Sequence, residues 1–73
     1  MAADDDVDVE VGARVRLLLW EKRIPVKSAA VAIGVDPTGF GRRLRGERKW
    51  TLGEVRAVAR FLDTSVGALF GER

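Results

Sequence analysis

In the stretch GFGRRLRGERK, residues 39–49, five basic side chains follow two closely spaced glycines, Gly39 and Gly41. The cations are Arg42, Arg43, Arg45, Arg48 and Lys49. A guanidinium donates two hydrogen bonds to guanine O6 and N7, or binds a phosphate, so this composition suits a polyanionic partner. Each glycine inside a helix costs about 1 kcal/mol relative to alanine, so Gly39 and Gly41 predict a helix that approaches another surface closely.

Helical geometry divides these residues between two faces. In a helix over 37–45, Phe40 and Leu44 are spaced i, i+4 and point inward. At about 100° per residue the opposite face carries Thr38, Arg42 and Arg45, flanked by Gly39 and Gly41, with Arg43 nearer the core boundary. This pattern fits base edges or phosphates in the major groove of DNA. In the alternative interpretation the glycines relieve crowding and the arginines keep the domain soluble.

Individual roles follow from position. Arg42 is expected to contact a base, with a phosphate contact as the alternative. Thr38 is expected to contact a thymine methyl group or a phosphate, and its alternative role is a second local cap of the helix. Arg43 has the alternative of bracing Glu47 or Glu54. Phosphate contacts that add affinity rather than sequence preference are expected from Arg45, Arg48 and Lys49.

The helix over 37–45 has strong boundary signals. Asp36 offers a capping carboxylate and Pro37 a ring that suits the first helical turn. Pro25 starts a preceding helix over 26–33, and Gly34 suits its left-handed end. The sequence therefore predicts two helices joined by a short turn.

Three further helices complete a predicted all-α, compact five-helix domain. The first begins near Val9 to Gly12, with an inner stripe of Val11, Val15, Leu18 and Lys22. Thr51 and Glu54 form a capping box for the fourth helix, whose inner stripe is Leu52, Val55, Ala59 and Leu62. Ser65 caps the last helix, in which the core is closed by Val66, Leu69 and Phe70.

Two aromatic residues leave alternatives open. Trp20 lies on a second ridge of the first helix, together with Ala13, Leu17 and Ile24. For Leu17 and Trp20 a packed second face and a dimer or partner surface are both open. Trp50 is expected to be a lid on the core, and a base-stacking platform is its alternative.

Composition limits the class of protein. The 73 residues allow one domain, which we expect over 10–73 after an acidic disordered tail over 1–9. Residues 1–10 carry five acids and no base, whereas residues 11–73 carry 13 bases and 6 acids, a formal charge of +7. The tail is expected to be inert, or to compete with DNA for the basic face. There is no cysteine or histidine, no apolar run of membrane length, and no nucleotide-binding loop, so we expect a cytoplasmic protein that is not an enzyme and uses no metal or cofactor.

The stretch SAAVAIGVDPTGFGRRLRGERKWTLGEVRAVARFLDTSVGALFG, residues 28–71, resembles the Cro and lambda-repressor type of helix-turn-helix domain. The matching positions are Ala30, Gly34, Val35, Asp36, Phe40 and Gly46. The resemblance runs from about Val11 to Gly71 and implies a five-helix fold with 37–45 as the recognition helix in the major groove. GRRLRGERKW is similar to repressors of actinobacteria and their phages.

The chain departs from that family at two contact positions. Many members have a phosphate-bracing Gln where this chain has Val26, so Lys27 or Ser28 is expected to replace that contact. Pro37 stands where a Gln is frequent and donates no hydrogen bond, which moves base reading to Thr38 and Arg42.

The resemblance implies a sequence-specific regulator of transcription that binds double-stranded DNA, of the phage-type repressor or Cro-like kind. A homodimer is expected, either in solution or only on DNA, with no membrane and no small-molecule substrate. Two alternatives use the same fold: a protein-interaction module such as an antitoxin or adaptor, and an excision-type factor that bends DNA.

Overall fold

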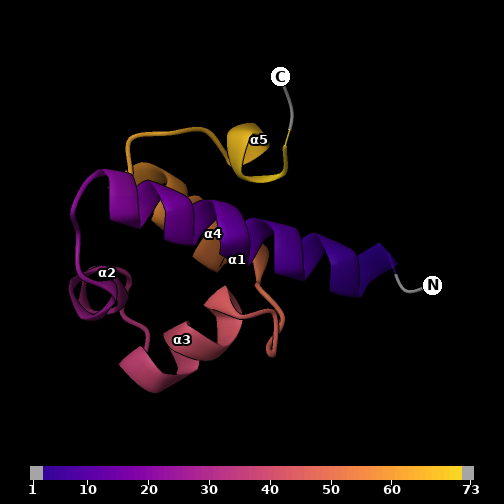
Figure 1. Cartoon of the computed structure of the whole chain (residues 1–73), viewed down its shortest axis with the longest axis horizontal. Helices are drawn as coiled ribbons and strands as arrows, with labels where there is room; N and C mark the ends of the chain where they lie inside the picture. Colours follow the sequence, from indigo (N-terminus) through magenta and orange to yellow (C-terminus); the bar gives the residue numbers. More distant parts are fainter. Residues whose placement is uncertain (1–2, 72–73) are drawn as a thin grey trace.

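The computed structural model describes residues 3–71, which form five α-helices and no strand. The helices are α1 (Ala3–Glu21), α2 (Val26–Ile33), α3 (Pro37–Leu44), α4 (Leu52–Phe61) and α5 (Val66–Leu69). In Figure 1, α1 crosses the molecule in front of α4. Helices α2 and α3 lie below α1, and α5 lies above α1. The all-α fold class with five helices is therefore confirmed within this part of the chain.

The first helix begins earlier than the sequence predicts. It starts at Ala3 instead of near Val9, so residues 3–9 are helical and the expected disordered tail over 1–9 is wrong for them; residues 1 and 2 lie outside the described part. Acidic residues favour the N-terminal turn of a helix because they interact well with its dipole. In addition, Asp8 is buried. Neither α1, at 19 residues, nor another helix within 3–71 has the apolar length to cross a bilayer.

The core is formed by one face of each helix. The fully buried apolar residues of α1 are Val11, Val15 and Leu19. The predicted stripe is wrong only at Lys22, which is exposed, because Leu18 is partly buried and packs against the core. A spacing of i, i+4, i+8 keeps Leu19 on the same side of α1 as Val11 and Val15, within the core. The remaining core is Ala29, Ala30, Phe40, Leu44, Val55, Val58, Ala59, Leu62 and Leu69.

Two predicted core positions at helix ends are wrong. Leu52 is exposed at the start of α4, and Phe70 is exposed just after α5. Val58 is buried in place of Leu52, because the inward face of α4 follows Val55, Val58 and Leu62.

The predicted caps and turns are confirmed. Asp36 Oδ2 accepts a hydrogen bond from Gly39 N at 3.0 Å. Thr51 and Glu54 form the reciprocal capping box, and Ser65 caps α5 by accepting from Ala68 N at 3.0 Å. Gly34 adopts the left-handed conformation, φ 75°, between α2 and α3. These local signals set the position of α3 relative to α2.

A close helix crossing sets the position of α3 relative to α1. Gly12 is buried, and a Cβ atom added there would lie 2.5 Å from Leu44 O and 2.7 Å from Arg43 O. Only hydrogen at this position lets the backbones of α1 and α3 approach so closely. The last turn of α3 is thus held directly against α1.

Candidate nucleic-acid interface

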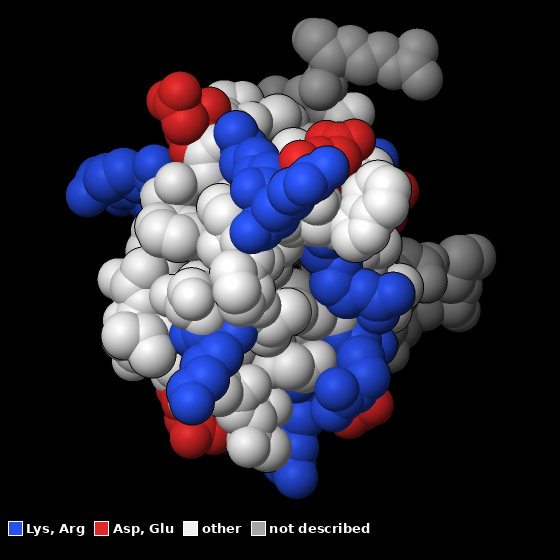
Figure 2. Space-filling model, turned by 60° about the vertical axis from the view of Figure 1, so that its left-hand side comes forward, with Lys and Arg blue, Asp and Glu red and all other residues white. Residues whose placement is uncertain are grey.

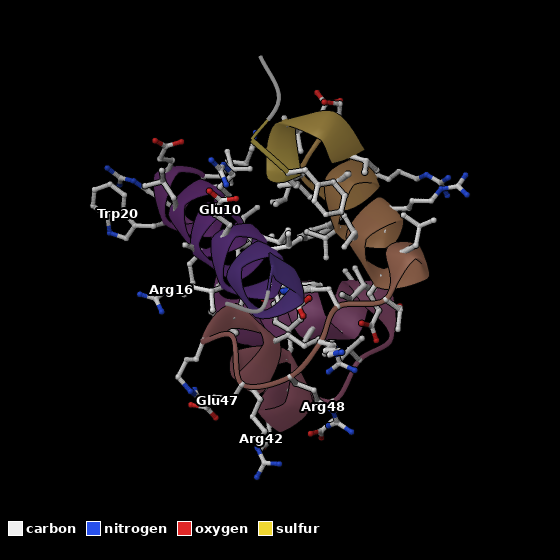
Figure 3. The ribbon with its side chains drawn as sticks, turned by 90° about the vertical axis from the view of Figure 1, so that its right-hand side faces the viewer. Glu10, Arg16, Trp20, Arg42, Glu47 and Arg48 are labelled. Atoms are coloured by element: carbon white, nitrogen blue, oxygen red, sulfur yellow. The ribbon has the colours of Figure 1, made fainter. Side chains whose placement is uncertain are left out.

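The outward face of α3 carries the side chains that the sequence predicts for it. Thr38, Arg42 and Arg45 are exposed, and Phe40 and Leu44 are buried on the opposite side. Arg42 projects away from the body of the protein below α3 in Figure 3. Among the described residues Arg42 has no ion-pair partner, so its guanidinium retains its donors.

The prediction that Gly39 belongs to this outward face is wrong. Gly39 is buried, and an added Cβ would lie 3.1 Å from Arg43 Nη1 and 3.4 Å from Arg48 Nη1. The two arginine side chains fold over it, so its backbone is covered by the protein's own chain. Gly41 is half-buried, and an added Cβ there would meet Arg45 Nη1 at 3.4 Å. The uncovered backbone strip predicted around both glycines is therefore absent at Gly39.

Arg43 joins α3 to α4. Its Nε donates to Glu54 Oε1 and its Nη2 to Glu54 Oε2, both at 2.9 Å. The side chains are 12% and 19% exposed. Burial acts to raise the pKa of Glu54, but the Thr51 backbone N–H and the Arg43 guanidinium together lower it below its usual value. Of the two braces considered for Arg43, the one to Glu54 is present, and the expectation that Arg43 faces DNA does not hold in this arrangement.

An acidic side chain lies among the cations after α3. Glu47 Oε2 accepts from Arg45 Nε at 2.9 Å, and both side chains are exposed. The hydrogen bond from Arg45, and then its charge, lower the pKa of Glu47, and the charge of Arg42 adds to this effect. Glu47 therefore stays ionised near neutral pH and partly neutralises the basic surface.

The loop after α3 is anchored by Trp50. The Trp50 and Phe40 rings meet edge to face, with centroids 5.8 Å apart and planes at 83°. Trp50 N donates to Asp8 Oδ1 at 3.0 Å, and the ring packs on the core, as the lid interpretation predicts. The preceding residues Arg48 and Lys49 remain exposed on the loop after α3. Figure 3 shows Arg48 and Arg42 at the same lower end of the molecule.

The start of α2 offers a second group of polar sites. Lys27 and Ser28 are exposed, and Pro25 at the N-cap provides no side-chain cap for the helix. Backbone N–H groups at such a terminus attract anions. In Figure 2, where α2 comes to the front, Lys and Arg side chains stand around a largely uncharged area. Val26 and Val31 are exposed apolar residues of α2.

The second ridge of α1 is open to solvent. Leu17 is 53% and Trp20 77% exposed, so the packed-face interpretation is wrong for both, and Ile24 is only partly buried. An open groove beside them runs to Pro25. Arg16 was not predicted as part of this surface; it lies one helical turn before Trp20 and projects to the same side of α1 in Figure 3. Its i, i+4 spacing from Trp20 was the available signal.

The structure thus places Thr38, Arg42 and Arg45 on the exposed face of α3 and Arg48 and Lys49 on the loop that follows, whereas Gly39 is covered by side chains and Arg43 is bound to Glu54. No protein-family model and no curated protein matches the chain. The arrangement of α3 and of the cations around it therefore carries the functional inference.

Proposed function

We propose that this protein is a sequence-specific regulator that binds double-stranded DNA with α3 in the major groove. The observation that carries the proposal is the position of Thr38 and Arg42, exposed on the face of α3 opposite buried Phe40. An α-helix fits the major groove, whose base edges present a distinct pattern for each base pair. The resemblance to Cro and lambda-repressor domains supports a phage-type repressor or Cro-like role in the cytoplasm.

The proposed contacts divide into two kinds. Arg42 donates to guanine O6 and N7, and Thr38 contacts a neighbouring thymine methyl. Arg48 and Lys49, exposed on the loop after α3, contact phosphates, as do Arg45 and the start of α2 at Lys27 and Ser28. Gly41 lies half-buried beside Arg45, where the backbone of α3 comes nearest to the DNA.

Protection mapping on the DNA upstream of its own gene, at stated salt, tests the proposal. We expect one protected site. Arg42→Ala is expected to reduce the discrimination between matched and mismatched base pairs by about 1 to 3 kcal/mol, the value for a bidentate contact. Thr38→Ala is expected to reduce this discrimination by less. Arg48→Ala and Lys49→Ala are instead expected to weaken all duplexes alike and to lower the salt slope by about 0.9 for each lost phosphate contact.

Arg60→Ala, an exposed cation on α4, is the matched control and is expected to change neither quantity. Unchanged affinity and base preference in both the Arg42 and the Thr38 variants would show that α3 does not read bases.

A protein-interaction module on the same fold is the second candidate. The exposure of Trp20, at 77%, favours it, because large aromatic residues are enriched at protein interfaces. Stoichiometric capture of another protein, combined with no retention of duplex DNA at low salt, would support this candidate over the first.

A further inference from the structure

One stripe along α1 has the spacing of a helix-pairing surface. Val9, Ala13, Arg16 and Trp20 follow one another at steps of four, three and four residues, and all four are exposed. Leu17 widens the stripe on one side. Alternating steps of three and four are the seam along which two helices pack. This stripe extends beyond the Leu17 and Trp20 surface considered from the sequence.

Charge is segregated along the same helix. Residues 1–10 carry five acids and no base, whereas residues 11–23 carry four bases and one acid. Next to the stripe, Glu10 is 60% exposed on the N-terminal side of Ala13, and within the stripe Arg16 is exposed on the C-terminal side. Ala13, at the centre, is small enough for a close crossing of two helices.

We propose that this stripe pairs two copies of the chain through antiparallel α1 helices that cross at Ala13. Residues equidistant from Ala13 then meet across the axis: Arg16 lies against Glu10 of the partner subunit, and Leu17 lies against Val9 of the partner subunit. Each contact occurs twice because the pair is two-fold symmetric. Parallel pairing places acidic halves together and basic halves together, and such like-charge contacts are unfavourable.

The direction of pairing has a consequence for α3. Figure 3 looks along α1, with Trp20 and Arg16 projecting to one side and Arg42 projecting downward. A two-fold axis perpendicular to α1 makes the two α1 helices antiparallel and leaves both Arg42 side chains on one side of the dimer. An axis parallel to α1 would place them on opposite sides. The charge pattern therefore selects the arrangement in which both α3 helices face the same way, although the pairing itself does not depend on DNA binding.

Charge-swapped variants test the pairing by sedimentation at low salt without DNA. Glu10→Arg alone and Arg16→Glu alone each create two like-charge contacts, so we expect each to lower the self-association constant at least about tenfold. The two single variants, when mixed, are expected to form a heterodimer, because every contact between them joins opposite charges. The double swap Glu10→Arg/Arg16→Glu is expected to restore self-association in one chain.

Matched controls separate this effect from local changes. Glu10 also pairs with Arg14 in its own chain, at 3.5 Å, so Arg14→Ala removes that pair but leaves the stripe charges unchanged and is expected to associate as the wild type does. Circular dichroism of each variant checks that the helices form. The proposal is overturned if the wild-type chain stays monomeric up to about 1 mM. It is also overturned if the chain pairs with itself only on DNA, or if it associates only with a different protein. A mixture of the single variants that associates no better than each variant alone overturns it as well.

Discussion

At the scale of single residues, neighbouring arginines of α3 have different environments. Arg42 is exposed and has no ion-pair partner among the described residues, whereas Arg43 is bound by both oxygens of Glu54. One residue turns the side chain by about 100° around the helix, which is enough to move it from solvent to the edge of the core. Arg43 therefore stabilises the fold, whereas Arg42 is available for the proposed contact with DNA.

Glu54→Gln is expected to lower the free energy of unfolding by about 1 kcal/mol at pH 7. The amide oxygen still accepts from Arg43 Nε and from Thr51 N, but the bond from Arg43 Nη2 is lost because the amide NH2 group cannot accept it. The folded-state pKa of Glu54 lies below the usual value of a glutamate, so the wild-type advantage is fully present above that usual pKa and declines as the pH falls through the folded pKa. Urea unfolding of both proteins between pH 3 and 7 measures it. An advantage that is constant over this range would contradict the assignment.

Glu47→Gln is expected to strengthen binding to any DNA duplex, because it frees Arg45 and removes a negative charge from the basic surface. If Arg45 then contacts a phosphate, the slope of log K against log salt becomes steeper by about 0.9. A salt titration with two unrelated duplexes checks this. Strengthening that is confined to one sequence would mean that Glu47 acts on base recognition instead.

The exposed side chains of α3 were predictable from the sequence, but the cover over Gly39 was not. Phe40 and Leu44 fix the inward direction of α3, and that determines where Thr38 and Arg42 point. Gly39 is covered by Arg43, one turn further along α3, and by Arg48, which reaches it from the loop after α3. The path of that loop depends on tertiary contacts, which helical periodicity does not describe.

At the scale of elements, helices with clear end signals were predicted best. The bounds of α2, Val26–Ile33, match the prediction, because Pro25 and Gly34 enclose it. The predicted start of α1 was wrong. Repeated Asp indicates a solvated tail by its composition, but carboxylates are also favourable at the N-terminus of a helix. Arg23 and Asp63 adopt left-handed backbone conformations, φ 59° and 57°, at chain turns where no glycine signals one.

Gly12→Ala is expected to destabilise the fold by about 1 to 3 kcal/mol, because the new methyl group would collide with backbone carbonyls of α3 and force the two helices apart. Thermal unfolding measures the change. Gly53→Ala on α4 is the matched control, since its Cβ meets nothing closer than 4.0 Å, and its stability is expected to be unchanged or higher. Equal effects at both positions would argue against the close crossing of α1 and α3.

At the scale of the whole molecule, the first helix ties the domain together. The radius of gyration is 11.1 Å, close to the value of about 11 Å expected for a single domain of this length. α1 packs against both α3 and α5, and Asp8 near its start binds Trp50, 42 residues away. The segment that composition separates from the domain is thus part of its architecture.

Asp8→Ala is expected to lower the free energy of unfolding by about 1 to 2 kcal/mol, because it leaves the partly buried backbone N–H of Trp50 without its acceptor. For a domain of this size that corresponds to a fall in Tm of about 4 to 8 °C for each kcal/mol. Asp8→Asn keeps an acceptor oxygen at this position and is expected to unfold near the wild-type temperature. If alanine were tolerated equally well, the contact would contribute nothing to stability.

The contrasting positions of the two tryptophans give the protein two separate optical reporters. The chain has no tyrosine, so its near-ultraviolet emission comes from Trp20 and Trp50. Trp20 is open to solvent and accessible to a dissolved quencher such as iodide, whereas Trp50 lies edge-on against Phe40. A fall in the quenching of Trp20 thus reports that another molecule covers this side of α1. The emission of Trp50, which the quencher reaches less easily, reports whether the core is intact.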